Sequence, residues 1–131
     1  MMSVPARRRR AGFGPDQSGA AALEFAFILP PLLVLLFGIV EGGRLLWAYN
    51  VLQFAVEAAA RCAVIDQAQC GTTSLVQTYA AAKTYALNPD PGIFSVDTLP
   101  CGTQVAGRLT VTTLGPVAVT VTLEARSCRP R

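Results

Sequence analysis

The acid with the most unusual setting in this sequence is Glu24, which stands at the start of a long apolar segment. Between Phe25 and Val40 there is no charged residue, and the 21 residues from Ala20 to Val40 are about the ~20 that a helix needs to span a bilayer. A carboxylate inside such a segment costs on the order of 2.5–3.5 kcal/mol on membrane-insertion scales. We therefore expect the charge of Glu24 to have a use.

Cysteine is the second residue type that could do chemistry, and all of it follows the apolar segment. The gaps between successive cysteines are 8, 31 and 27 residues, and the sequence has no histidine. Structural zinc sites usually hold cysteine pairs roughly two to four residues apart, so zinc is not expected. An oxidising compartment would instead allow two disulfides. The cysteines are Cys62, Cys70, Cys101 and Cys128.

Catalytic patterns are missing from the sequence. Without histidine, the usual Ser/His and Cys/His arrangements are excluded, and no glycine-rich phosphate loop occurs. The carboxylates after the apolar segment are scattered without a shared spacing, so we interpret them as solvated charges. We therefore do not expect the protein to be an enzyme or to have catalytic residues. We also expect it to bind no cofactor, no metal ion and no small-molecule substrate.

The positive charge of the chain is concentrated before the apolar segment. Residues 1–19 carry a net charge of +3, which is the net charge of the whole chain. Basic residues that flank a membrane helix stay on the cytoplasmic side, so the N-terminus should be cytoplasmic and the C-terminal part outside. Nucleic-acid binding is not expected, because no interleaved aromatics or recognisable module support it. The arginines of this topology signal are Arg7, Arg8, Arg9 and Arg10.

Residues 1–19 have the composition of a cytoplasmic leader. A twin-arginine signal fits poorly, because the apolar run lies too far downstream. An ordinary signal peptide would be cut after its apolar core, yet the nearest Ala-x-Ala site, Ala58–Ala60, lies about 18 residues beyond Val40. A cut between Gly19 and Ala20 would differ in its outcome, because the helix would be kept.

We expect a transmembrane helix over residues 20–47, with Pro30 and Pro31 inside it. Proline removes a backbone donor and crowds the preceding turn, which predicts a kink. The kink is either passive or a flexible point that lets the subunit leave the bilayer for a filament. Trp47 and Tyr49 fall just past the membrane end, where aromatic side chains favour the interface.

An extracytoplasmic helical region is expected over residues 48–87. The first helix should continue to Ala63, with Glu57 and Arg61 forming an i, i+4 pair on its polar face. A second helix should run from the capping-box pattern Ser74-Leu75-Val76-Gln77 to Leu87, with an apolar face of Leu75, Tyr79, Ala82 and Ala86. The apolar stripe of the first helix is Leu45, Tyr49, Leu52, Val56, Ala59 and Ala63.

Residues 88–131 should form a small antiparallel β region. After the turn cluster 88–92, alternation predicts strands over 94–98, 109–113 and 117–124, with Gly115-Pro116 as a tight hairpin. The first and third strands of such a meander run the same way, so we expect Cys101 to pair with Cys128. Cys62 and Cys70 would then close a local loop. The expected fold class is α+β: a long pilin-like helix, a short second helix and a three-stranded sheet.

The start of the apolar segment resembles a known processing signal. Gly19, four small or apolar residues and then Glu24-Phe25 resemble the class III signal of type IV pilin precursors. The extension Glu24-Phe25-Ala26-Phe27-Ile28-Leu29-Pro30, followed by Phe37-Gly38 and Gly43-Arg44, resembles the TadE-like family of minor pilins, or pseudopilins, of tight-adherence (Tad/Flp) pilus and secretion systems. The resemblance covers roughly residues 16–63.

The resemblance implies a function in assembly. A prepilin peptidase would cut after Gly19, and Glu24 and Phe25 would serve in assembly or in recognition by the peptidase. In assembly, Glu24 would pair with the N-terminal amine of a neighbouring pilin or pseudopilin subunit. The protein would lie in the bacterial inner membrane as a single-pass protein with a periplasmic C-terminus and contribute to pilus assembly and adhesion. The resemblance leaves open whether it stays at the base of the pilus or is incorporated into the extracellular pilus. Two alternatives remain open. Glu24 could reach cytoplasmic water, and the chain could be an uncut membrane accessory or sensor protein with a disulfide-stapled binding domain.

Overall fold

The computed structural model describes residues 17–115 and 117–130, so the arginines Arg7–Arg10 and most of the expected leader lie outside the described residues. The fold is α+β, as the sequence predicts, with a long helix, short helices and one antiparallel sheet. The chain divides into two units, one up to Leu36 and one from Phe37 onward.

The described part of the first unit is entirely helical and belongs to helix α1 (Gln17–Ile65). Most of its apolar side chains, including Phe25 and Phe27, are exposed. The helix is a candidate membrane span by its length and composition. It is helical through Pro30 and Pro31. Apolar residues all round a helix are typical of a segment that lies in lipid.

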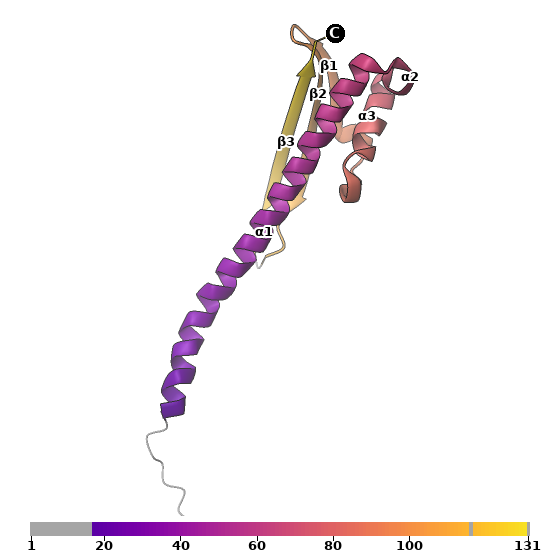
Figure 1. Ribbon diagram of the computed structural model, residues 1–131. Helices are drawn as coiled ribbons and strands as arrows, with labels where there is room; N and C mark the ends of the chain where they lie inside the picture. Colours follow the sequence, from indigo (N-terminus) through magenta and orange to yellow (C-terminus); the bar gives the residue numbers. More distant parts are fainter. Residues whose placement is uncertain (1–16, 116, 131) are drawn as a thin grey trace, which may run out of the picture. The chain divides into compact units, whose positions relative to one another are not determined.

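The second unit combines the C-terminal part of α1 with a three-stranded sheet and short helices (Figure 1). The helices are α2 (Gln67–Cys70) and α3 (Thr73–Ala82), followed by the 3-10 turns η1 (Tyr85–Leu87) and η2 (Pro91–Ile93). The strands are β1 (Phe94–Leu99), β2 (Gly102–Thr112) and β3 (Thr120–Arg129). Within this unit, α3 packs against β1.

The sheet is a meander in the order β1-β2-β3, and both neighbouring pairs are antiparallel. The predicted strand boundaries were partly wrong: β2 begins at Gly102 rather than at residue 109, and β3 runs from Thr120 to Arg129 rather than over 117–124. The first half of β2 has small residues and little apolar alternation, so its strand character comes from pairing with β1 and β3 on both sides. One of these small residues, Gly107, lies against the Phe94 ring, and a Cβ added there would stand 2.8 Å from a ring carbon.

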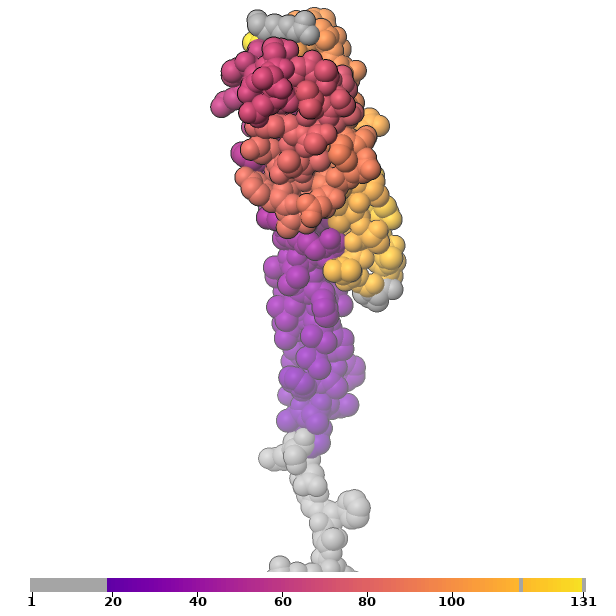
Figure 2. Space-filling view, turned by 90° about the vertical axis from the view of Figure 1, so that its right-hand side faces the viewer, coloured from indigo at the N-terminus to yellow at the C-terminus, as the bar shows by residue number. Residues whose placement is uncertain are grey.

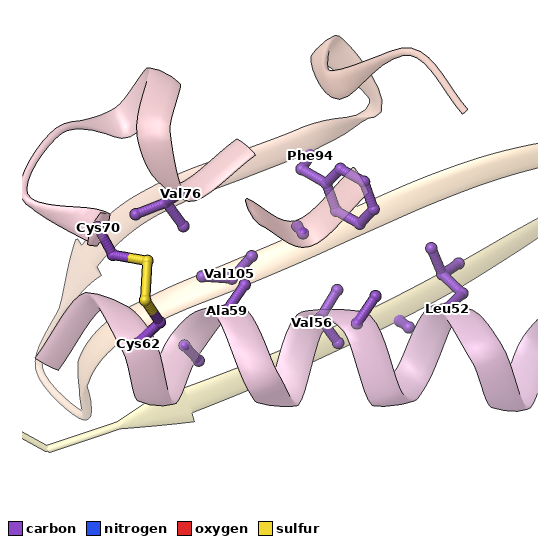
Figure 3. Close-up of a cluster of buried hydrophobic side chains, with 12 residues drawn as sticks. Leu52, Val56, Ala59, Cys62, Cys70, Val76, Phe94 and Val105 are labelled. Atoms are coloured by element: carbon purple, nitrogen blue, oxygen red, sulfur yellow. A yellow bond between two sulfur atoms is a disulfide. The ribbon is translucent and has the colours of Figure 1, made fainter. Parts of the chain in front are cut away.

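The core of the second unit is formed where α1, α3 and the sheet meet. In Figure 3, Leu52, Val56 and Ala59 of α1 lie near Val105 and Phe94 of the sheet. All five are fully or almost fully buried. Burial of this apolar surface is the main stabilising contribution available to such a small unit.

The apolar stripe predicted for α1 was wrong at Tyr49. Tyr49 is 40% exposed, whereas its neighbour Ala48 is buried. Ala48, Leu52 and Ala55 are spaced as residues on one helix face, and all three are buried. At this end of α1 the buried face therefore includes Ala48 in place of the predicted Tyr49. The predicted pair of Glu57 with Arg61 is not among the ion pairs of the described residues, and Gln53 Nε2 instead donates to Glu57 Oε1 at 3.0 Å.

Helix α3 differs from the prediction at both ends and in its buried face. Thr72 caps it, accepting from the Leu75 N–H at 3.4 Å, so the helix starts before the predicted box at Ser74. It ends at Ala82, where the buried Thr84 hydroxyl donates to the Ala81 carbonyl at 2.6 Å. The buried residues are Val76 and Ala80, whereas Leu75, Tyr79, Ala82 and Ala86 are exposed or only partly buried.

The structure contains the two expected disulfides, Cys62–Cys70 and Cys101–Cys128. The segment inside the first is not the predicted loop, because α1 continues to Ile65 and Asp66 caps α2 by accepting from two N–H groups at 3.0 and 3.1 Å. The second disulfide joins the β1–β2 turn to β3, since Cys128 lies within β3 and not beyond it.

Candidate functional site

The expected processing site lies at the start of α1, where Gly19 and Ala20 are both helical and exposed. A Cβ added at Gly19 would meet no atom within 4 Å. Glycine inside a helix is less stable than alanine by roughly 0.5–1 kcal/mol, so the fold itself gains nothing from a glycine here. A reason for Gly19 therefore has to be sought outside the folded chain.

The expected assembly residues follow one turn later on the same helix. Glu24 and Phe25 are both exposed. Within the part of the chain that the structure describes, no ion pair engages the Glu24 carboxylate. Ala20 and Glu24 stand at i, i+4 and share a helix face. The two residues are thus presented together to whatever surrounds α1.

Sequence reasoning missed a polar cluster at the end of the apolar segment, formed by Glu41 and Arg44. Arg44 donates to both carboxylate oxygens of Glu41, with Nη2–Oε1 at 2.5 Å and Nε–Oε2 at 3.1 Å. The side chains are 18% exposed for Glu41 and 34% for Arg44. The available signal was an acid and a base at i, i+3 directly after Val40.

The same two residues also bind the hairpin that joins β2 to β3. Arg44 Nη2 donates to the Thr112 carbonyl at 2.7 Å, and the Leu114 N–H donates to Glu41 Oε1 at 3.2 Å. Both contacts join residues about 70 positions apart in sequence, which is why no local pattern revealed them. We call Glu41, Arg44, Thr112 and Leu114 the hairpin clamp.

The end of this hairpin is apolar and exposed. Leu114 is 77% exposed and Val117 is 71% exposed, and Val119 is also exposed. In Figure 2 the orange-yellow surface of the hairpin lies beside the purple surface of α1, in agreement with the clamp contacts. We call Leu114, Val117 and Val119 the hairpin tip. The expected hairpin residue Pro116 lies outside the described residues.

The remaining predicted residues are not brought together into one site. The two prolines lie in the first unit, and both disulfides lie in the second. Among the residues that the structure describes, no group of three or more His, Cys, Asp or Glu side chains could hold a metal ion. The predicted residues are therefore distributed between an exposed helix face of the first unit and a disulfide-linked second unit.

Comparison with known proteins supports the resemblance read from the sequence. Residues 19–61 match a family model described as TadE-like protein. No curated protein and no solved structure matches the chain. The match begins at Gly19 and includes Glu24, both prolines, Glu41 and Arg44. Over residues 19–61, a minority of the chain, the sequence is therefore similar to TadE-like proteins, a similarity that suggests an association with tight-adherence pilus systems.

Proposed function

We propose that this protein is a minor pilin or pseudopilin of a tight-adherence-type pilus or secretion system. A prepilin peptidase cuts after Gly19, and the mature chain starts at Ala20. Residues 20–47 hold the subunit in the bacterial inner membrane until assembly. The disulfide-linked C-terminal unit faces the periplasm, and the subunit contributes to pilus assembly and adhesion.

The observation that carries this proposal is the start of the TadE-like match at Gly19. A match confined to the apolar run would suggest only a membrane anchor. This one includes the glycine, the acid five residues later and the amphipathic part of α1. It therefore covers both the residues that a peptidase would read and the residues that a neighbouring subunit would contact.

Two structural features support the proposal. The open space around Gly19 means that packing within the chain does not demand glycine, so recognition by an enzyme is a sufficient reason for it. The exposed carboxylate of Glu24 has no ion-pair partner within the described residues. In lipid such a charge is stabilised by a cation, and cleavage creates one at the amine of Ala20.

Docking of subunits then follows from charge pairing. The Glu24 carboxylate of one subunit binds the Ala20 ammonium of its neighbour, because both groups are costly to leave unpaired in a low-dielectric environment. Glu24 cannot favour a neighbour's uncut leader in the same way, since that chain has no amine at residue 20. Cleavage would in this way license assembly.

The test is the N-terminal residue of the protein extracted from membranes of cells that contain a prepilin peptidase. We expect Ala20 as the first residue, and a full-length chain in cells that lack the peptidase. The Gly19→Asp variant should stay full length. Gly14→Asp, the same change within the leader, is the matched control and should be cut normally.

Two results would contradict the proposal. A full-length wild-type chain in peptidase-containing cells would favour an uncut membrane accessory protein. Normal cleavage of Gly19→Asp would show that the peptidase does not read Gly19.

A further inference from the structure

The β2–β3 hairpin has a composition unlike the rest of the second unit. From Leu109 to Leu123 there is no charged residue, and threonine is the only polar side chain. The charged residues that flank this segment, Arg108 and Glu124, face each other in the register and form an ion pair at 3.6 Å. The hairpin beyond that pair therefore presents an uncharged end, although it belongs to the unit expected outside the membrane.

The hairpin clamp sets where this uncharged end lies within the unit. Glu41 and Arg44 stand on α1 directly after the exposed apolar residues Phe37, Ile39 and Val40. The hydrogen bonds from Arg44 to Thr112 and from Leu114 to Glu41 hold the hairpin tip beside that part of the helix. Two apolar surfaces of the second unit, one on α1 and one on the hairpin, thus lie at the same end.

Several backbone groups at the base of the tip have hydrogen-bond partners within the chain. The Thr113 N–H donates to the Val119 carbonyl at 2.9 Å, and the Val119 N–H donates to Thr113 Oγ1 at 2.9 Å. The Thr112 carbonyl and the Leu114 N–H bind the clamp. Water would satisfy these groups in an exposed loop, but in lipid an unsatisfied backbone group is costly. The internal partners therefore lower the cost of moving the base of the tip out of water.

We propose that the hairpin tip, Leu114, Val117 and Val119, inserts into the boundary between lipid headgroups and acyl chains and forms a second membrane contact beside α1. The inference rests on the proposed function, because it requires α1 to be in a bilayer. An exposed apolar cluster is costly in water and marks an interaction surface. Continuity with the apolar end of α1 makes lipid the occupant, and the nearby Trp47 has the position of an interfacial aromatic residue.

Membrane contacts at both α1 and the hairpin tip would restrict the orientation of the second unit more than a contact at α1 alone. With α1 alone as anchor, the unit could turn about the helix axis. A second insertion point beside α1 would hold one face of the sheet toward the membrane until the subunit is extracted. The clamp would transmit this restraint, since it ties the tip to the helix through Glu41 and Arg44.

The test places a single tryptophan at chosen positions of the full chain, in a Trp47→Phe background. The protein is reconstituted into phosphatidylethanolamine–phosphatidylglycerol vesicles that contain phosphatidylcholine brominated near the start of its acyl chains. Val117→Trp and Leu114→Trp report on the tip, and Phe37→Trp reports on α1. Leu99→Trp is the matched control, an exposed apolar position at the β1–β2 end of the sheet.

The expected result is a loss of fluorescence for Val117→Trp and Leu114→Trp that is comparable with the loss for Phe37→Trp, while Leu99→Trp keeps its emission. If Phe37→Trp is quenched and the tip variants behave like Leu99→Trp, the second contact is refuted and the anchor stands. If Phe37→Trp is not quenched, the membrane anchor itself fails. A tip tryptophan with blue-shifted but unquenched emission would show that another protein surface covers the tip, which overturns lipid as its occupant.

Discussion

Arg44 binds Glu41 one turn away on the same helix while also donating to the Thr112 carbonyl of the β2–β3 hairpin. The ion pair neutralises both charges at the position where the uncharged segment of α1 ends. Charge-assisted hydrogen bonds of this kind are roughly twice as strong as neutral ones. The pair positions the hairpin tip through Thr112 and Leu114. If α1 lies in a bilayer as proposed, the pair would also limit the cost of charge near lipid.

Removing the acid of this pair should loosen the hairpin without unfolding the unit. In Glu41→Ala the Leu114 N–H loses its acceptor, so its hydrogen exchange should become faster than in the wild type. Glu57→Ala is the matched control, because that carboxylate lies on α1 and its bond is to Gln53. Unchanged exchange at Leu114 in Glu41→Ala would show that the clamp does not hold the hairpin in solution.

The two disulfides should differ in how much they stabilise the second unit. In the chain-entropy model the separation of 27 residues between Cys101 and Cys128 predicts about 3.6 kcal/mol, and the separation of 8 between Cys62 and Cys70 predicts about 2.5 kcal/mol. Paired Cys→Ser variants, unfolded by denaturant in detergent, measure both values. Equal costs, or the reverse order, would count against chain entropy as the main contribution.

Phe94 and Gly107 face each other across β1 and β2, and their variants should be coupled. Phe94→Ala should lower the free energy of unfolding by about 3–5 kcal/mol, because the ring is fully buried. Gly107→Ala should cost about 1–3 kcal/mol, because its Cβ would crowd the Phe94 ring. In the double variant the added Cβ meets no ring, so the second change should cost less than in the wild type.

The control for that cycle is Ser95→Ala, an exposed position next to Phe94 on the same strand. It should change the free energy of unfolding by no more than about 0.5 kcal/mol. If the changes in the free energy of unfolding for Phe94→Ala and Gly107→Ala were strictly additive, the Phe94 ring would not be the reason that residue 107 has to be glycine.

The role proposed for Glu24 depends on its charge rather than on its size. Glu24→Gln keeps the shape and removes the charge, so we expect a chain that is inserted and cut but is not recovered in assembled pilus material. Glu24→Asp keeps the charge on a shorter side chain and should restore part of the assembly. The measurement is the fraction of subunit in sheared filaments, with membrane levels as the control. Normal assembly of Glu24→Gln would remove the charge-pairing role.

Local patterns in the sequence were enough for most of the architecture. The uncharged run from Phe25 to Val40 predicts a membrane-length helix, because helix formation and lipid compatibility depend on neighbouring residues only. After residue 88 the apolar residues change from helical spacing to alternation, and this local pattern predicts the strands of the sheet. The pairing of Cys101 with Cys128 followed from the geometry of a meander, even though Cys128 turned out to lie inside β3.

The errors share a physical cause, which is that burial depends on a partner. The sequence placed Tyr49 and Leu75 on apolar faces, but the structure buries Ala48 and Val76 instead, because the neighbouring elements decide which face of each helix is covered. Helix α3 ends at Ala82, and the first half of β2 is a strand because β1 and β3 pair with it.

The sequence by itself determined the apolar segment from Ala20 to Val40 with its single acid, Glu24, the position of every cysteine after that segment, and the TadE-like signature that begins at Gly19. Only the tertiary structure decided that the β2–β3 hairpin returns to α1. Its contacts join Arg44 to Thr112 and Glu41 to Leu114 across 68 and 73 residues. Hydrogen bonds over such separations depend on how the sheet packs on the helix, and no local pattern of residues encodes that packing.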